Sequence, residues 1–346
     1  MKTFKSFKEK DEIFFHMKID NINTLITELK NFEPVTICNP YFKKDVVKKN
    51  LFRGMTNATY RLYSSIQRCL DYRQNKGIKL SLTTLEREIF YRFHSNDKIQ
   101  DAFKLEVSDS AHPSILAQWA FIQHFGGPSH FIDFTPNIEN AFFFAIPTKE
   151  IELQYNNDEN DLNNYISIYI YPDNIFEYGN LNELYHHGSV SGRNTYLRTL
   201  KEHPEVQIDV NDVRKEMFEQ PLDPQFWGLS IYGSEIFKIS DILTGEETSV
   251  NLSNSHILRQ NGNFFCGNTC HMIPLELAPN LRQAYRTIED NKLHFNKYGH
   301  CYDIHKKLIP EIKNYYTVPT ISQIYTEENY LQEAKDELKK LWENPF

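Results

Sequence analysis

Apolar residues recur at helical spacing in several parts of the chain. Between residues 21 and 32, the residues Ile22, Leu25, Ile26 and Leu29 follow the i, i+3, i+4, i+7 spacing that places side chains on one face of a helix. Similar spacing predicts further helices over residues 85–93, 115–125 and 327–342. The chain is therefore expected to contain several amphipathic helices.

Short runs of β-branched and aromatic residues predict strands between these helices. Residues 165–171 alternate in this way over a full strand length, and residues 51–54 and 131–132 form shorter runs. Weaker strand patterns occur at residues 231–232, 235–239 and 263–265. Because helices and strands are mixed along the chain, we expect an α+β fold with a central mixed or antiparallel sheet flanked by helices.

The pattern changes near residue 276. From Leu277 onward it is helical, and the last predicted helix places Leu331, Ala334 and Leu338 on one face. A chain of 346 residues has room for two domains. We therefore expect residues 1–275 to form the main domain and residues 276–346 to form a helical C-terminal extension packed on or next to it.

Charge and hydropathy limit the partners of the chain. It contains 46 acidic and 38 basic residues, a net charge of −8, which disfavours non-specific nucleic-acid binding. No apolar run approaches the ~20 residues of a membrane span, and the first 15 residues lack the apolar core of a signal peptide. We expect a cytoplasmic protein without a membrane partner, and the protein partner, if one exists, is open.

Two groups of residues contain side chains that can bind metals. The spacing of His124, His130 and Asp133 matches no standard zinc motif, and Cys266 and Cys270 form one loose pair where a structural zinc site needs four ligands. The odd number of scattered cysteines is typical of reduced thiols; they are Cys38, Cys69, Cys266, Cys270 and Cys301. No metal is predicted.

Three polar motifs stand out as candidate chemistry. The first, Phe52-Arg53-Gly54, presents a guanidinium at a strand end beside a glycine that lets a ligand or another backbone approach. The second, residues 123–136, joins a helix end, a Gly-Gly-Pro turn, a short strand and the start of a helix expected at Thr135-Pro136. The third, residues 254–264, is a polar loop leading into a strand. A local alternative is that Asp133 and Thr135 only cap the following helix.

The three motifs together resemble the FRG domain family, whose name comes from its aromatic-Arg-Gly motif. The resemblance spans residues 52–264. Its central block is matched by Gln123, His124, Gly126, Pro128, Asp133 and Thr135, and its closing motif by Gln260, Gly262 and Phe264. Three positions depart from the family pattern: Ser129-His130 replace Thr-Arg, Phe134 replaces Trp, and His256 replaces Arg.

The resemblance implies a polar nucleotide-type pocket in a bacterial or phage protein. One reading is ADP-ribosyltransferase-like chemistry on NAD as substrate, in phage defence or as a toxin; the alternative is a non-catalytic sensor or interaction module for a nucleotide or nucleic acid. The implied catalytic residues are His124, Asp133 and Gln260. The implied ligand-binding residues are Arg53, Gly54, Arg68, Gln123, Ser129, His130, Thr135 and His256. Glu246 or Glu247 is an acidic substitute for Gln260.

Overall fold

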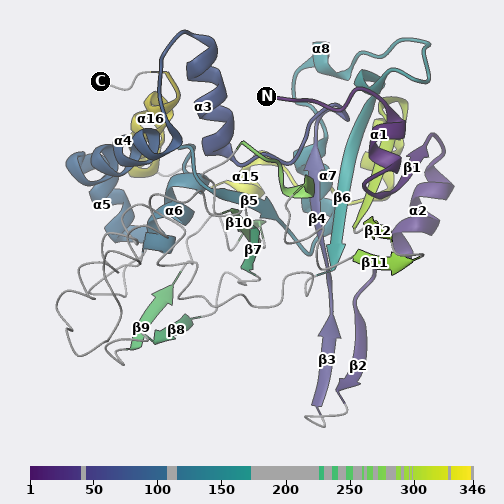
Figure 1. Cartoon of the computed structure of the whole chain (residues 1–346), viewed down its shortest axis with the longest axis horizontal. Helices are drawn as coiled ribbons and strands as arrows, with labels where there is room; N and C mark the ends of the chain where they lie inside the picture. Colours follow the sequence, from purple (N-terminus) through teal and green to yellow (C-terminus); the bar gives the residue numbers. More distant parts are fainter. Residues whose placement is uncertain are drawn as a thin grey trace.

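Figure 1 shows a computed structural model of the chain. The structure describes residues 1–39, 44–106, 115–172, 226–229, 236–240, 247–251, 259–260, 263–267, 272–277, 286–289, 292–295, 297, 299–325 and 329–343. Two groups of elements lie side by side in this view, one built around a four-stranded sheet and the other around a helical cluster with a smaller sheet (Figure 1).

The larger sheet is mixed. Its strand order is β1 (Phe15–Ile19), β13 (His300–His305), β6 (Tyr165–Pro172) and β4 (Asn50–Met55). β1 runs parallel to β13, and the other two pairings are antiparallel. The prediction of an α+β fold with a central mixed sheet is confirmed.

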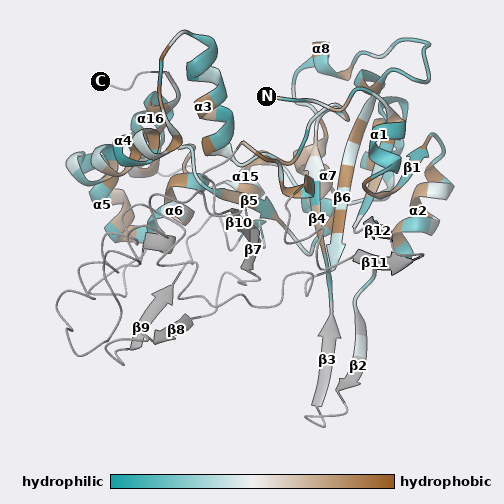
Figure 2. Cartoon of the chain, viewed as in Figure 1, coloured by the Kyte–Doolittle hydropathy of each residue, from teal (hydrophilic) through white to brown (hydrophobic). Residues whose placement is uncertain are grey.

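Strand β6 is buried on both faces, because its alternate residues enter two different hydrophobic clusters. Ile166, Ile168 and Ile170 pack on one face, and Tyr169 and Tyr171 pack on the other. Figure 2 shows the apolar residues along this strand. The isoleucine face is covered by α2 (Ile22–Lys30), α7 (Ile138–Ala145) and α14 (Ile309–Tyr315). The tyrosine face is covered by Phe4, Phe14 and neighbouring residues around α1 (Phe7–Asp11).

The second group contains a three-stranded antiparallel sheet and most of the long helices. The sheet order is β5 (Phe131–Phe134), β10 (Asn263–Gly267) and β7 (Phe226–Leu229). The helices are α3 (Ser65–Asn75), α4 (Leu82–Ser95), α5 (Asp97–Glu106), α6 (Ile115–His124) and α16 (Asn329–Glu343). Leu331, Ala334 and Leu338 of α16 are buried in this cluster, as their helical spacing predicted.

The remaining described elements are short. Three separate hairpins are β2 (Val35–Asn39) with β3 (Lys44–Lys48), β8 (Ile236–Ser240) with β9 (Glu247–Asn251), and β11 (Arg286–Glu289) with β12 (Lys292–Phe295). The short helices are α8 (Glu150–Leu153), α15 (Ile321–Ile324), η1 (Leu162–Asn164), η3 (Leu275–Leu277) and η4 (Lys306–Leu308). None of the described helices has the length and apolar character needed to cross a bilayer.

The helical reading of residues 276–346 is wrong for part of that range. β13 lies between β1 and β6 in the central sheet, and β11 and β12 precede it. The segment did not look like a strand in sequence because Asp303 is polar, although its side chain is fully buried against Lys10 from the other end of the chain. The division into domains at residue 276 stays a prediction.

Some helices were missed or started elsewhere. Helix α3 was not predicted: its buried face mixes the apolar Ile66, Cys69 and Leu70 with the polar Gln67 and Arg73, so the apolar spacing covers little more than one turn. Those two side chains are satisfied by distant groups: Gln67 donates to the carbonyl of Ile273, and Arg73 pairs with Glu88 at 2.7 Å. Buried polar side chains of this kind interrupt the apolar spacing from which a helix is predicted.

A buried ionic cluster ties the N-terminal segment to the sheet. Lys10 Nζ lies 2.7 Å from Asp303 Oδ1, and both side chains are fully buried. Ser167 Oγ donates to Asp303 Oδ1, and His16 Nε2 lies 2.9 Å from Asp303 Oδ2. Burial alone raises the pKa of Asp303, but Lys10 and His16 more than offset this effect, so the pKa lies below its ordinary value.

We expect Asp303→Asn to destabilise the protein by about 3–5 kcal/mol at pH 7, because it leaves the buried Lys10 ammonium without a counter-charge. The folded-state pKa of Asp303 is lowered, so its stabilisation is present above the unfolded-state pKa and is lost as pH falls through the folded-state pKa. Urea unfolding between pH 7 and pH 3 should therefore show a difference between wild type and variant that shrinks on acidification.

The matched control for this measurement is Asp101→Asn, which makes the same change at a side chain of α5 that is 74% exposed. It should shift stability by no more than a few tenths of a kcal/mol. Equal stability of Asp303→Asn and Asp101→Asn at pH 7 would contradict the role given to the buried cluster.

Candidate functional site

A β-bridge between the two sheets brings the first two motifs together. The N–H of Phe52 donates to the carbonyl of Thr135 at 2.7 Å, and the N–H of Thr135 donates to the carbonyl of Phe52 at 2.9 Å. The bridge sets Arg53 of β4 beside Asp133 of β5. Arg53 Nη1 donates to the Asp133 backbone carbonyl at 2.5 Å and lies 3.9 Å from Asp133 Oδ2.

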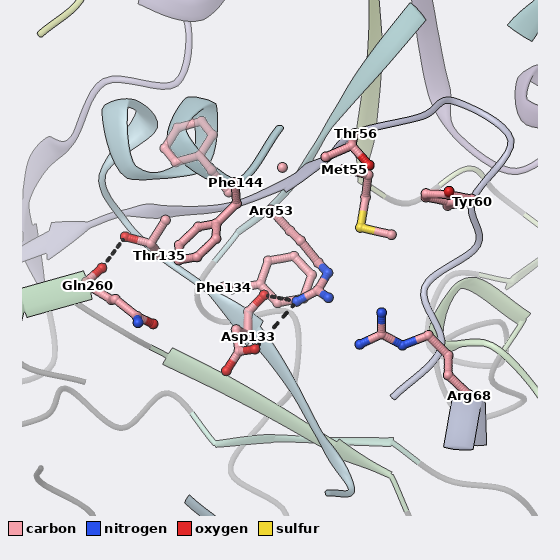
Figure 3. A pocket seen from close by; sticks show the side chains of 12 residues that line it. Arg53, Met55, Thr56, Tyr60, Arg68, Asp133, Phe134, Thr135, Phe144 and Gln260 are labelled. Atoms are coloured by element: carbon pink, nitrogen blue, oxygen red, sulfur yellow. Dashed lines mark hydrogen bonds and ion pairs between the residues drawn. The ribbon is translucent and has the colours of Figure 1, made fainter. Parts of the chain in front are cut away.

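A pocket of about 240 Å³ opens at this junction (Figure 3). It includes Arg53 and Asp133 from the two bridged strands, Arg68 from α3, and Gln260 from the closing motif. The described residues that line it are Phe52, Arg53, Gly54, Met55, Thr56, Tyr60, Arg68, Asp133, Phe134, Thr135, Phe144 and Gln260. Segments separated by more than 200 residues therefore contribute to one concave surface.

Positive charge exceeds negative charge among the described residues that line the pocket. The guanidinium groups of Arg53 and Arg68 both point into it, and Asp133 supplies the carboxylate (Figure 3). Burial lowers the pKa of Arg53 to about 10; Asp133 opposes that effect and Arg68 adds to it. Burial also lowers the pKa of Arg68, again opposed by Asp133. Both arginines remain charged at neutral pH. Together they disfavour the binding of a cationic ligand and favour an anionic one.

Gln123, at the end of α6 and outside the pocket lining, positions the Asp133 carboxylate by a hydrogen bond. Gln123 Nε2 donates to Asp133 Oδ2 at 2.5 Å. The amide oxygen of Gln123 accepts hydrogen bonds from Ser65 Oγ and Ser129 Oγ, each at 2.7 Å. Since both hydroxyls occupy the oxygen, the NH₂ group faces Asp133. Gln123 and Ser129 therefore act behind the pocket wall rather than in its lining, where ligand-binding roles were predicted for them.

Thr135 holds Gln260 in place. Thr135 Oγ1 donates to the Gln260 carbonyl at 3.0 Å, and Asn140 Nδ2 donates to the same carbonyl at 2.7 Å. The Gln260 side chain lines the pocket (Figure 3). The alternative in which Asp133 and Thr135 cap the next helix is wrong, because α7 begins at Ile138 with Asn137 as its N-cap.

His124 lies at the back of the site. Its Nε2 is 3.6 Å from Asp133 Oδ1, and its ring meets Phe264 edge to face at 5.3 Å. Burial lowers the pKa of His124, although Asp133 and a hydrogen bond with Gln260 oppose the shift. The ring is therefore neutral at pH 7. It contacts two pocket residues but is not part of the pocket lining.

His130 points away from the pocket. Its ring stands edge to face on Trp119, and its Nε2 is 3.6 Å from Glu86 of α4. The side chain is buried in the helical group, so the structure places it apart from Arg53 and Asp133. His256 lies outside the described residues. Among the residues that are described, no three His, Cys, Asp or Glu side chains are arranged to hold a metal ion.

The glycine of the aromatic-Arg-Gly motif is required by helix packing. A Cβ atom at Gly54 would lie 1.9 Å from the carbonyl oxygen of Ala141 and 2.7 Å from the N atom of Ala145. Helix α7 thus lies directly on β4, with small residues at its contact points. The sequence suggested that Gly54 allows close approach of either a ligand or another backbone. The structure supports the second reason, because the neighbouring atoms belong to the backbone of α7.

Several lining residues were not predicted to bind a ligand. Met55, Thr56, Tyr60, Phe134 and Phe144 line the pocket, and none was assigned a ligand-binding role. Tyr60 and Phe144 belong to a turn and a helix whose pocket-facing sides depend on the tertiary arrangement. Asn140, which supports Gln260, was also missed, and Ser65, which supports Gln123, matches a serine position of the FRG pattern but was given no role in the site. Asn140 and Ser65 are polar residues inside helices, and only their burial distinguishes them from solvent-facing positions.

The fold and site define an α+β protein with a cationic pocket at the junction of two sheets. Residues 48–153 match the model of the FRG domain, and this part of the chain is an FRG domain. The match includes Arg53, Arg68 and the residue 123–136 block, and it ends before Gln260. No curated protein and no solved structure shows significant similarity to the chain.

We expect Gly54→Ala to destabilise the protein by about 3 kcal/mol or more, because the added methyl group meets backbone atoms of α7 that cannot move independently. Chemical denaturation measures the loss. Ala141→Gly should not rescue the variant, since the clash is with the Ala141 carbonyl oxygen rather than its side chain.

Gly77→Ala is the control for Gly54→Ala. Gly77 has a φ of +84° and no atom within 4 Å of its added Cβ, so it tests backbone strain without a clash. That strain costs about 1–2 kcal/mol. A Gly54→Ala protein no less stable than Gly77→Ala would show that α7 does not press on β4 as described.

Proposed function

We propose that the pocket binds a phosphate-bearing nucleotide of the NAD type. The observation that carries the proposal is the convergence of the Arg53 and Arg68 guanidinium groups on one partly buried cavity that contains a single carboxylate among the described lining residues. Arginine forks match the geometry of phosphate oxygens, and their charge counts for more in a pocket that excludes water.

Aromatic groups at the pocket suit the flat rings of a nucleotide. The Tyr60 side chain is 45% exposed while lining the pocket, and Phe144 lies on the opposite side of Arg53 (Figure 3). Stacking of a base or nicotinamide ring on an aromatic side chain contributes about 1–3 kcal/mol. The pocket therefore offers both a charged end and a stacking surface.

Cleavage of NAD is a second candidate function, favoured by the arrangement of Arg53, Thr135 and Gln260. These residues come from β4, the end of β5 and the segment before β10, and all three line one pocket. The aromatic-Arg-Gly opening is similar to that of ADP-ribosyltransferase folds, where a basic residue holds NAD and a later strand carries a residue that contacts the ribose. Gln260 stands in that later position as a neutral amide.

The corresponding reaction breaks the bond between nicotinamide nitrogen and the ribose carbon. Nicotinamide leaves with the electron pair, and water or a nucleophile of a target molecule attacks the resulting oxocarbenium-like carbon and loses a proton. Positioning and charge stabilisation supply the rate enhancement in such a scheme. If the protein binds NAD without cleaving it, it acts as a sensor or interaction module for the nucleotide. Either NAD cleavage or NAD sensing suits a toxin or a phage-defence protein.

Binding is tested by isothermal titration of the full chain with NAD and ADP-ribose. We expect Arg53→Ala and Arg68→Ala each to weaken binding about tenfold to a hundredfold, which is the loss of a charged hydrogen bond. Arg87→Ala, at an exposed position of α4, is the matched control and should bind as wild type does. Equal affinity in all four proteins, or no binding by wild type, would exclude this pocket as the nucleotide site.

Turnover is tested by incubating the protein with NAD and measuring released nicotinamide. If the pocket cleaves NAD, we expect Gln260→Ala to lower the rate at saturating NAD by about tenfold or more while leaving NAD affinity within a few fold. Arg53→Ala should raise the NAD concentration needed for half-maximal rate. NAD binding without nicotinamide release would leave the sensor function and remove the catalytic one.

A further inference from the structure

A second cavity lies at the edge of the mixed sheet where β1 and β13 end. Its volume is about 350 Å³, at the lower end of the ~300–1,000 Å³ of pockets that hold small molecules. It shares no described lining residue with the pocket between the two sheets. Its lining includes Lys18, Asp20, Tyr155, Glu159, His305 and Lys307.

The parallel pairing of β1 with β13 brings much of this lining together. Lys18 and Asp20 come from the end of β1, and His305 and Lys307 come from the end of β13 and the turn after it. In open α/β sheets, ligands bind beyond the carboxyl ends of the strands. The two parallel strands of this mixed sheet create the same geometry at one edge.

His305 offers a hydrogen-bond donor that no described residue uses. Its Nδ1 accepts the N–H of Lys307 at 3.0 Å, so the proton of the neutral ring is on Nε2. Burial lowers the pKa of His305, which keeps the ring neutral at pH 7. The residue is only 7% exposed, yet Nε2 is not among the unsatisfied atoms that are cut off from solvent. A molecule in the cavity can therefore reach this N–H group.

The charged groups of the described lining are balanced. Lys18 and Lys307 supply two ammonium groups, and Asp20 and Glu159 supply two carboxylates. Lys307 Nζ and Asp20 Oδ2 are 4.0 Å apart and both side chains are exposed, so this ion pair is weak. Lys18 Nζ donates to the backbone carbonyl of Glu159 at 3.2 Å, and the Glu159 carboxylate forms no ion pair with a described residue. Both signs of charge are thus free to meet a ligand.

Aromatic rings supply the apolar part of the cavity. Tyr155 and Tyr165 each stand edge to face with His305, at 5.0 Å between ring centroids. The hydroxyl of Tyr165 donates to the carbonyl of Glu159 at 3.0 Å, which holds that ring in place. Tyr155 is 54% exposed while lining the cavity, so its ring is open to a flat apolar group.

We infer that this cavity binds a free aromatic α-amino acid. Its carboxylate is held by His305 Nε2 and Lys307, its ammonium group by Glu159, and its ring packs on Tyr155. A phosphate would face two carboxylates as well as two lysines, and a neutral sugar would use neither charge, whereas a zwitterion matches both. The inference goes beyond the proposed nucleotide function and does not depend on it.

The test is thermal unfolding of the full chain over a concentration series of five probes: L-phenylalanine, L-tryptophan, L-phenylalaninamide, N-acetyl-L-phenylalanine and L-alanine. Ligand binding stabilises the folded protein by RT ln(1 + [L]/Kd), so affinities can be compared. The amide lacks the carboxylate, the acetyl derivative lacks the ammonium group, and alanine lacks the ring. We expect L-phenylalanine to bind about tenfold or more tightly than each of these three, since each loses one contact.

Two variants separate the carboxylate contact from the ammonium contact. His305→Asn keeps a side-chain oxygen that can accept the N–H of Lys307 but removes the Nε2 donor, so it should reduce the preference for L-phenylalanine over its amide. Glu159→Gln removes the charge that meets the ammonium group, so it should reduce the preference over N-acetyl-L-phenylalanine. Glu311→Gln, exposed on α14, is the matched control and should bind every probe as wild type does.

Three results would overturn the inference. The first is the absence of stabilisation by either L-phenylalanine or L-tryptophan. The second is equal stabilisation by L-phenylalanine and its two blocked derivatives, which would show that the charges are not recognised. The third is an unchanged preference in both His305→Asn and Glu159→Gln, which would place the amino acid elsewhere on the protein. None of these results bears on the binding of NAD.

Discussion

The antiparallel bridge between Phe52 and Thr135 is the constraint on which the pocket depends. Two backbone hydrogen bonds join the mixed sheet to the small sheet, and they set Arg53 one residue beyond the bridge on β4 and Asp133 two residues before it on β5. Arg53 then reaches the Asp133 carbonyl. The acceptor of this bond is a backbone carbonyl that strand pairing holds in place. The guanidinium is therefore positioned before a ligand arrives, and less conformational entropy is lost on binding.

Close packing and polar support both act at this bridge. Helix α7 lies so near β4 that only a glycine fits at Gly54, and the same helix supplies Phe144 to the pocket and Asn140 to the carbonyl of Gln260. Beyond the FRG domain at residues 48–153, the chain completes the structure: β13 fills the centre of the sheet and α16 closes the helical group. The domain is therefore embedded in a larger fold.

Local sequence patterns were sufficient wherever a structural feature depends on neighbours in the chain. The spacing of Ile22, Leu25 and Leu29 predicted α2, and the alternation of residues 165–171 predicted β6, because amphipathic periodicity follows from helix and strand geometry alone. Motif resemblance placed Arg53 and Asp133 among the site residues, and both line one pocket. Their binding and catalytic roles remain predictions, as do those of His124 and Gln260.

Only the tertiary structure decided which polar residues face the cavity and which lie behind it. His130 and Gln123 stand in the same motif, yet one turns to Glu86 and the other supports Asp133. Residue type alone cannot separate these outcomes, because a buried polar side chain is placed by partners far away in the chain. The sequence by itself determined several helices such as α2, strand β6 and the motif residues; contacts across the fold determined the central strand β13 and the pocket, since no local pattern records which distant groups will meet.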